Sequence, residues 1–263
     1  MTHYVSRIQD AVSAGVQSTL LNILASGPIP KHVAFIMDGN RRYARMHQKQ
    51  VAQGHSDGFE ALRRMLEVCM KLGVRCVTAY AFAIENFKRS PEEVDALMKL
   101  AEEKLVEMAQ HGELLEQHGI RLNIIGRRDL LPAAVQAAIK RAEDMTRHHD
   151  KAILNLCMPY ASQDEITSAV ESLVQETLQE KDQRTLTEDD VDAHIMTTAV
   201  GSPPIDILVR TSGVKRLSDF LTWQTCENTQ IQFSDTYWPD FSFRDFVPIL
   251  LDYQRKVWTS SSS

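Results

Sequence analysis

Short apolar runs and longer amphipathic stretches alternate along most of this chain of 263 residues. The apolar runs have the length of buried strands, and the stretches between the earlier runs place apolar residues at the helical spacing of three and four positions. The expected strands are residues 33–37, 76–81, 122–125, 153–157, 205–209 and 231–233, and the expected helices are residues 58–72, 91–118, 132–148 and 164–180.

This alternation predicts an α/β fold. Parallel strands need a long crossover connection, which is usually a helix, so alternating elements favour a mainly parallel sheet with helices on both faces. We expect a central sheet of about six strands. No repeat and no change of composition divides residues 31–258, which should form one domain, and residues 259–263, mostly serines, should form a disordered tail.

Residues 1–30 carry a further helical pattern ahead of the first strand. Such an amphipathic helix packs on its own domain, binds a membrane surface or lines a substrate cavity, and the pattern alone leaves these alternatives open. Arg7 is the only arginine of this segment, which makes the membrane surface less favoured. The apolar positions are Val5, Ile8, Val12, Val16, Leu20, Ile23 and Leu24, and the pattern ends at Pro28 and Pro30.

Composition excludes some classes of protein. Hydrophobic residues make up 43% of the chain and the formal net charge is −6. An acidic balance argues against nucleic-acid binding, which uses a basic surface. Basic residues nevertheless gather at 41–45 and 210–216, which indicates a specific anion pocket. The chain shows no apolar run near the roughly 20 residues that span a bilayer, and no secretory signal.

The four cysteines are expected to be reduced. Cys69, Cys76, Cys157 and Cys226 lack the Cys-x-x-Cys spacing of redox and zinc sites. Three of them lie in apolar runs, where a small buried thiol is the ordinary interpretation, with disulfides or zinc as the less favoured alternatives. A reducing, cytosol-facing compartment follows as the expectation.

The strongest chemical signal follows the first expected strand. The apolar run up to Met37 ends in Asp38, Gly39, Asn40, Arg41 and Arg42. A charge cluster at the carboxyl end of a buried strand is where an open α/β sheet places its ligand. The glycine lets the backbone approach that ligand closely. One carboxylate beside several anion-binding groups indicates a divalent metal that holds a phosphorylated substrate.

Two more strand ends carry polar motifs. Residues 80–90 read YAFAIENFKRS, which by itself is typical of a capping loop. Residues 206–220 read DILVRTSGVKRLSDF, and the two arginines around Ser-Gly favour a phosphate loop over surface ion pairs. Gly54 and His55 lie between the first and second motifs, and a histidine beside glycine is on its own more often a loop residue.

Taken together, these motifs resemble those of the cis-prenyltransferases, which build Z-polyprenyl diphosphates from isopentenyl diphosphate. The resemblance covers roughly residues 31–253 and is strongest to the catalytic subunits of eukaryotic dehydrodolichyl diphosphate synthases. It implies a transferase that uses Mg²⁺, extends farnesyl diphosphate in a hydrophobic tunnel, and supplies dolichol synthesis for protein glycosylation. It also implies a peripheral location on the cytosolic face of the endoplasmic reticulum or on lipid droplets.

The resemblance assigns roles to individual residues. Asp38 would bind Mg²⁺ and would be catalytic together with Asn86 and His55. Phe82 and Phe87 would shape the entrance for the prenyl chain. The substrate-binding residues would be Gly39, Asn40, Arg41, Arg42 and Arg89 for the allylic diphosphate, and Arg210, Arg216 and Ser218 for isopentenyl diphosphate.

The chain departs from bacterial members at several positions. Val51 stands where they carry a diphosphate-binding arginine, and Ala83 replaces a serine. Thr229 stands where they carry a glutamate that shares the metal, and nearby Glu227 is a substitute that the sequence does not favour.

A further departure concerns a partner. Single-subunit relatives end with an Arg-x-Gly motif, which the segment from Tyr253 to Trp258 lacks. Eukaryotic catalytic subunits share this absence and take the motif from a homologous accessory subunit, so we expect a heteromer. The aromatic residues 237–243 fit either the core or that interface. The alternative is that this chain is itself the non-catalytic subunit, which the intact Asp38 and arginines disfavour.

Overall fold

A parallel sheet of six strands lies at the centre of the protein, a computed structural model that describes residues 15, 19–110, 113–180 and 184–260. The strands are β1 (His32–Ile36), β2 (Cys76–Tyr80), β3 (Ile120–Ile125), β4 (Ala152–Cys157), β5 (Ile207–Arg210) and β6 (Gln230–Phe233). Their order is β3-β4-β2-β1-β5-β6, and every neighbouring pair is parallel. The expected α/β fold is confirmed.

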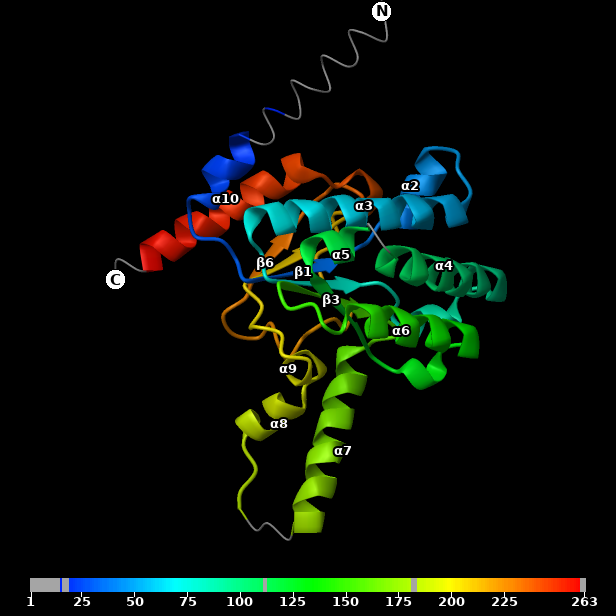
Figure 1. Ribbon diagram of the computed structural model, residues 1–263, viewed down its shortest axis with the longest axis vertical. Helices are drawn as coiled ribbons and strands as arrows, with labels where there is room; N and C mark the ends of the chain where they lie inside the picture. The colour runs from blue at the N-terminus through cyan, green and yellow to red at the C-terminus, as the bar shows by residue number, and fades with distance from the viewer. Residues whose placement is uncertain (1–14, 16–18, 111–112, 181–183, 261–263) are drawn as a thin grey trace, which may run out of the picture.

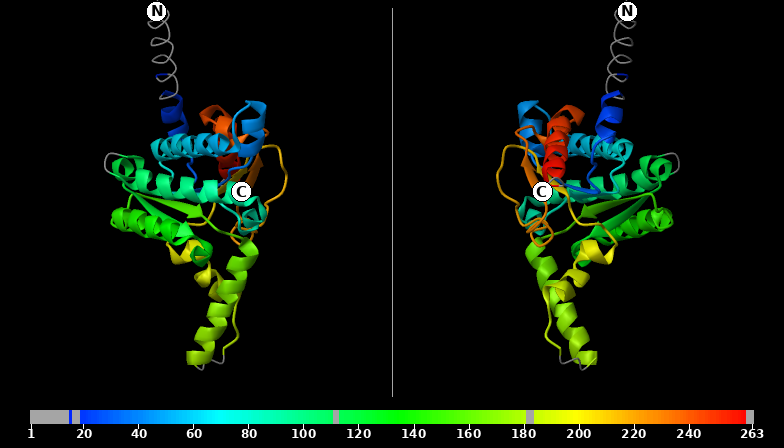
Figure 2. Two further views of the ribbon diagram at one scale, coloured as in Figure 1. Left: turned by 90° about the vertical axis from the view of Figure 1, so that its right-hand side faces the viewer. Right: turned by 90° about the vertical axis from the view of Figure 1, so that its left-hand side faces the viewer.

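Helices cover both faces of this sheet (Figure 1). The larger hydrophobic core lies between one face of the sheet and the helices α3, α4, α6 and α10. A smaller core on the other face includes Leu217, Phe220, Leu221 and the start of α9. The helix α7 extends away from the sheet with α8 beside it (Figure 2). The helices are α2 (Asn40–Met46), α3 (Val51–Leu72), η1 (Ile84–Lys88), α4 (Pro91–Ala109), α5 (Leu114–His118), η2 (Arg128–Leu130), α6 (Ala133–Thr146), α7 (Ser162–Glu180), α8 (Glu188–His194), α9 (Met196–Ala199), η3 (Trp238–Asp240) and α10 (Phe243–Ser260).

The central strand β1 is buried along its whole length. Val33 and Phe35 face the larger core, whereas Ala34 and Ile36 face the smaller one. Burial on both faces explains why the strands appear in the sequence as continuous apolar runs. The aromatic segment 237–243 belongs to the core, because the Trp238 ring lies 5.5 Å from the Phe35 ring, centroid to centroid, and is fully buried.

The order of the strands creates a switch point between β1 and β5. The chain passes from β1 to its neighbour β2 on one side, and from β5 to its neighbour β6 on the other. Ligands of open parallel sheets bind in the crevice outside the carboxyl ends of such a strand pair. Ile36 lies opposite Arg210 in the register of β1 and β5, so the residues that follow Ile36 meet Arg210 at this crevice.

Several expected boundaries differ in the structure. The helix expected at 91–118 is two helices, because the backbone at Gln110 turns to an extended conformation after α4. The helix α10 was not predicted, since Pro248 inside it interrupts the helical signal. It continues through Ser260, so residues 259 and 260 of the expected tail are helical, and residues 261–263 lie outside the described residues.

The described part of the N-terminal segment packs on its own domain. Residues 19–25 are helical, and Leu21 and Leu24 are buried in the larger core. The Leu24 carbonyl accepts a 2.8 Å hydrogen bond from Gln254 Nε2 of α10. Ile23, expected on the apolar face, is instead 62% exposed. Val5, Ile8, Val12 and Val16 lie outside the described residues.

The three cysteines in apolar runs are buried, and Cys226 is exposed. All four are unbridged, as expected. Burial raises the pKa of the Cys69 and Cys76 thiols to about 12, so both are protonated and unreactive at neutral pH. No helix in the described part of the chain has the length and hydropathy to cross a membrane.

Candidate active site

The switch point brings Asp38, two residues after β1, against Arg210, the last residue of β5. Arg210 Nη2 donates a 2.9 Å hydrogen bond to Asp38 Oδ2. The backbone of Asp38 is fixed on both sides, because its N–H donates to Thr211 Oγ1 at 3.0 Å and its carbonyl accepts from the Trp238 N–H at 2.9 Å. The carboxylate is therefore held at the sheet edge while its side chain stays 31% exposed.

Arg42 is a second cationic partner of Asp38. Its Nη2 lies 3.2 Å from Asp38 Oδ1 and donates a 2.6 Å hydrogen bond to Ser212 Oγ. The guanidinium also stacks over the Tyr237 ring at 5.3 Å from the centroid. Burial raises the pKa of Asp38, but the hydrogen bonds from Arg210 and Ser212 and the charge of Arg42 outweigh it and hold this pKa below its ordinary value. The carboxylate is ionised at neutral pH.

The loop after β5 gathers three of the predicted site residues. Arg210 Nη1 donates to Ser218 Oγ at 2.7 Å and to the carbonyl of Arg216. Arg216 Nε donates to the same hydroxyl at 3.2 Å. Ser212 and Ser218 have φ values of 78° and 52°, in the left-handed region that residues with side chains seldom adopt. Such backbone strain is concentrated at ligand sites in proteins.

Asp219 fixes this loop to the start of α7, and sequence reasoning did not identify it. Its carbonyl accepts from the Ser162 N–H at 2.8 Å, and its Oδ1 accepts from the Gln163 N–H at 3.0 Å. A carboxylate at the N-terminus of a helix is stabilised by the helix dipole. Only its position directly after Ser218 could have drawn attention to Asp219.

Glu93, in the first turn of α4, is the second residue that sequence reasoning missed. Its Oε1 accepts a 2.8 Å hydrogen bond from Arg89 Nη1 and lies 3.6 Å from His55 Nε2. Its Oε2 lies 3.5 Å from Arg41 Nη1. The side chain is only 17% exposed, so it links three predicted site residues from three segments of the chain.

A sequence signal for Glu93 existed. Ser90 and Glu93 have the spacing of a helix capping pair, and the Glu93 N–H donates to Ser90 Oγ at 3.4 Å. Within the same turn, Arg89 Nη2 donates to Asn86 Oδ1 at 2.9 Å. The capping interpretation of residues 80–90 is therefore confirmed, and the functional role of this motif stays a prediction.

His55 lies where the charged residues meet the apolar interior. It belongs to α3, which begins at Val51, and so is not the loop residue that its glycine neighbour suggested. Its side chain is 11% exposed. Burial lowers the pKa of His55, and the charge of Arg89 lowers it further against the opposing effect of Glu93. The imidazole is therefore neutral at pH 7.

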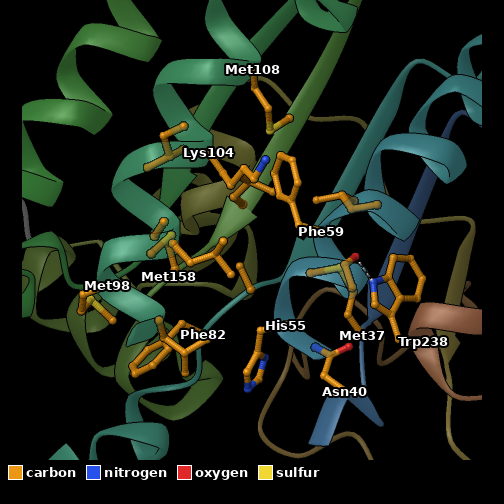
Figure 3. A pocket seen from close by; sticks show the side chains of 18 residues that line it. Met37, Asn40, His55, Phe59, Phe82, Met98, Lys104, Met108, Met158 and Trp238 are labelled. Atoms are coloured by element: carbon orange, nitrogen blue, oxygen red, sulfur yellow. Dashed lines mark hydrogen bonds between the residues drawn. The ribbon is translucent and has the colours of Figure 1, made fainter. Parts of the chain in front are cut away.

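His55 lies at one end of the apolar cavity drawn in Figure 3, and it also lines the polar pockets beside it. A pocket of about 290 Å³ is lined by Asp38, Asn86, Arg89, Arg210, Arg216 and Ser218. A neighbouring pocket of about 390 Å³ adds Gly39, Arg41 and Arg42. An apolar cavity of about 110 Å³ lies between α3 and α4 and is lined by residues such as Phe59, Leu62, Phe82, Met98 and Trp238. His55 and Asn40 line all three spaces.

Two glycines of α3 allow α2 to approach closely. A Cβ at Gly54 would lie 2.5 Å from the Asn40 carbonyl oxygen, and a Cβ at Gly58 would lie 2.5 Å from Asn40 Oδ1. Gly39 has a φ of 111°, which turns the chain from β1 into α2. Asn40 Oδ1 has no hydrogen-bond partner among the described residues, which leaves one buried acceptor at the pocket.

These donors fit a Mg²⁺ ion that is bound together with a diphosphate. Asp38 is ionised and borders the pocket, and the described residues contain no group of three or more metal-binding side chains. Mg²⁺ commonly takes one or two carboxylates and completes its shell with substrate phosphates and water. Each carboxylate oxygen has two lone pairs, so Asp38 can keep its arginine partners and still bind a metal.

All predicted catalytic and substrate-binding residues therefore lie at one edge of the sheet, and their chemical roles stay predictions. Glu227 does not join them. Glu227 and Thr229 precede β6 at the amino edge, whereas Asp38 follows β1 at the carboxyl edge of the same parallel sheet. Within this chain, Glu227 cannot share a metal with Asp38.

Comparison with known proteins agrees with this arrangement. Residues 36–259 match the family model described as putative undecaprenyl diphosphate synthase. A dehydrodolichyl diphosphate synthase complex subunit of Schizosaccharomyces pombe is 46% identical over 91% of this chain and 90% of its own length. A subunit of the same description from Homo sapiens is 43% identical over 89% of this chain and 69% of its own length.

A solved structure shows the same fold. Lavandulyl diphosphate synthase from Lavandula x intermedia, in complex with dimethylallyl diphosphate, superposes with a TM-score of 0.79 at 30% identity. The match covers 86% of this chain and 95% of that one.

Proposed function

Because this chain belongs to the undecaprenyl diphosphate synthase family of cis-prenyltransferases, we propose that it is the catalytic subunit of a dehydrodolichyl diphosphate synthase. It would condense isopentenyl diphosphate onto farnesyl diphosphate and lengthen the product in steps of one isoprene unit. The observation that carries this proposal is the ionised Asp38, held between Arg42 and Arg210 beside an apolar cavity.

The two ends of the site suit the two parts of an allylic diphosphate. Asp38 would hold Mg²⁺, which would supply positive charge to the departing diphosphate. Arg41, Arg42 and Arg89 would bind that group and stabilise the charge that develops as it leaves. The apolar cavity would take the prenyl chain and exclude water from the allylic carbon, which isopentenyl diphosphate, bound by Arg210 and its neighbours, attacks with loss of a proton.

Typical interaction free energies indicate which groups contribute most to diphosphate binding. A helix end contributes about 0.3–1 kcal/mol to a nearby anion. A hydrogen bond to a charged group contributes about 1.5–3 kcal/mol, and an arginine can form two of them to one phosphate. The arginines should therefore supply most of the diphosphate affinity. Each five-carbon unit that enters the cavity adds about 4 kcal/mol of apolar burial, at about 0.8 kcal/mol per carbon, which favours retention of the growing chain.

We also propose that the enzyme is a heteromer with a homologous accessory subunit. The relatives from Schizosaccharomyces pombe and Homo sapiens are each named as a subunit of a complex. The chain offers a surface for a partner, because Val170, Val174 and Leu178 form an exposed apolar stripe along α7. The apolar product supports a peripheral position on the cytosolic face of the endoplasmic reticulum or on lipid droplets, in dolichol synthesis for glycosylation.

Incorporation of radiolabelled isopentenyl diphosphate tests these proposals. The full chain is incubated with farnesyl diphosphate and Mg²⁺, with and without the candidate accessory subunit, and labelled products are separated by length. Long labelled polyprenyl diphosphates support the proposed activity, and their absence in both arms rejects it. Equal turnover with and without the partner rejects the heteromer. Full activity of a complex that carries Asp38→Ala would instead assign this chain the non-catalytic role.

A further inference from the structure

Tyr80 and Asp219 line the polar pocket on either side of Ser218 in the loop after β5. The ring of Tyr80, the last residue of β2, stacks on Phe220, with centroids 4.4 Å apart and an angle of 13° between the planes. Its hydroxyl donates to the Tyr160 carbonyl at 3.1 Å and lies 3.4 Å from the Ser218 carbonyl. Burial raises the pKa of Tyr80, so the hydroxyl stays protonated and acts as a donor.

The backbone around Ser218 has a conformation that needs support from outside the loop. The φ values of Ser218, Asp219 and Leu221 are 52°, 58° and 49°, in the left-handed region that residues with side chains seldom adopt. Such a conformation persists only where the surrounding structure holds it. The Tyr80 ring holds this stretch on one side, and the hydrogen bonds of Asp219 with the start of α7 hold it on the other.

The supported residue, Ser218, has a hydroxyl that is arranged to donate to an anion. Its oxygen accepts from Arg210 Nη1 at 2.7 Å and from Arg216 Nε at 3.2 Å. A hydroxyl has two acceptor lone pairs and one proton, so both lone pairs are used and the proton remains for a ligand. Because two guanidinium groups meet at the same point, an oxygen of a phosphate is the fitting acceptor.

We propose that Tyr80 and Asp219 are positioning residues for isopentenyl diphosphate, an inference that rests on the proposed function. Together they hold Ser218 in the backbone conformation that places its hydroxyl between Arg210 and Arg216. The arginines proposed for the allylic diphosphate belong to α2 and to the turn before α4. Loss of the support should therefore weaken the binding of one substrate and spare the other.

Steady-state kinetics of two Tyr80 variants test the stacked side. Tyr80→Leu removes the ring and should raise the KM for isopentenyl diphosphate about tenfold, while the KM for farnesyl diphosphate stays within about twofold of the wild type. Tyr80→Phe keeps the stack and loses only the hydroxyl contacts, so the KM for isopentenyl diphosphate should rise about twofold. An equal rise of both KM values in Tyr80→Leu overturns the proposal.

Two Asp219 variants test the other side. Asp219→Ala removes the acceptor for the Gln163 N–H and disfavours the positive φ, so the KM for isopentenyl diphosphate should rise about tenfold. Asp219→Asn keeps an acceptor oxygen and tolerates this conformation, so it should restore the wild-type value. Equal defects in the two variants assign the effect to the charge of the carboxylate and overturn the positioning role. Asp206→Ala is the matched control, because Asp206 accepts backbone N–H groups at the opposite edge of the sheet, and its KM values should match the wild type.

The assay uses the assembly that gives turnover with the unaltered chain, and unfolding temperatures are measured for all variants. If Tyr80→Leu does not fold, Tyr80→Phe and the two Asp219 variants decide. Unchanged KM values in folded variants of an active assembly overturn the role of both residues and leave the proposed function intact. Absence of polyprenyl product from the unaltered assembly instead rejects the proposed function and this inference with it.

Discussion

The charged edge of the sheet and the apolar cavity between α3 and α4 are built in different ways. At the charged edge, Asp38 and Arg210 follow neighbouring strands, and backbone hydrogen bonds fix the residues around them. The cavity instead lies between side chains of α3 and α4, which the ion pair of Lys104 with Glu60 joins at one end. The charged groups therefore have positions fixed by the sheet, whereas the size of the cavity depends on how two helices pack against each other.

The largest effect should come from Asp38→Asn, which removes the carboxylate from the charged edge and leaves the apolar cavity unchanged. We expect kcat/KM to fall about a thousandfold, because the neutral amide binds metal weakly and leaves Arg210 without its counterion. Steady-state kinetics measure this loss. Asp57→Asn is the control, since Asp57 pairs with Lys49 at the surface, and this variant should keep nearly full activity. Comparable losses in both variants would show that the edge has no special role.

The buried histidine of β1, His32, should make the stability of the fold depend on pH. Burial lowers the pKa of His32, on β1, to about 4 from 6.5, and the neutral ring lies 2.7 Å from both the Pro203 carbonyl and Thr78 Oγ1. As the pH falls below 6.5 the unfolded chain takes up this proton first, so the folded state should lose about 3 kcal/mol by pH 4.

Urea unfolding at several pH values checks this expectation. His32→Gln should be less stable at pH 7 but should lose about 3 kcal/mol less on acidification. His47→Gln changes an exposed histidine and should keep the whole pH dependence. A His32→Gln curve parallel to that of the unaltered chain would assign the acid sensitivity to other groups.

Gly58→Ala tests the contact between the two regions. The added methyl group would meet Asn40 Oδ1 at 2.5 Å and push α2 away from α3. We expect a loss of about 1–3 kcal/mol in the free energy of unfolding, typical of overpacking, and weaker binding of the allylic diphosphate. Gly15→Ala, whose new group would have no atom of the described residues within 4 Å, should lose neither. Unchanged diphosphate affinity in Gly58→Ala would separate the glycine contact from the site.

The smallest effect should come from Glu93→Gln, which loosens Arg41, Arg89 and His55 together. We expect kcat/KM to fall about tenfold, mainly through a higher KM for the allylic diphosphate, because the arginines lose the group that orients them. Glu92→Gln alters the exposed neighbour and should stay near wild-type values. A fall confined to kcat would argue against a positioning role for Glu93.

Much of the fold could be predicted because its signals are local. Strands buried on both faces appear as apolar runs, and each of the six expected runs overlaps a strand. The helix α10 gave no such signal, since Pro248 lies within it. The start of α3 was placed seven residues late, because Gly54 looks like a loop residue until α2 is packed against it.

The site residues also divide into those with a local sequence signal and those without one. Asp38 and Arg210 could be found because they follow or end a strand, and parallel strand ends meet at one edge. Ser218 was assigned through the family resemblance. Asp219 was missed because no local pattern links it with Gln163, which lies 56 residues earlier in the chain. Glu93 was missed because two of its three partners, Arg41 and His55, come from other segments. Contacts of this kind appear only once the topology is known.

The close contact of Asn40 with Gly54 and Gly58 has a consequence for how the cavity can widen. The helix α3 is fixed by that contact and by nine buried residues, whereas α4 buries four. The two walls of the cavity are therefore unequally mobile, and a longer occupant should displace α4 rather than α3. Glu93 lies in the first turn of α4, so a movement of α4 would also shift Glu93 relative to Arg41 and Arg89 at the other end of the cavity. A full cavity would therefore weaken the binding of the diphosphate.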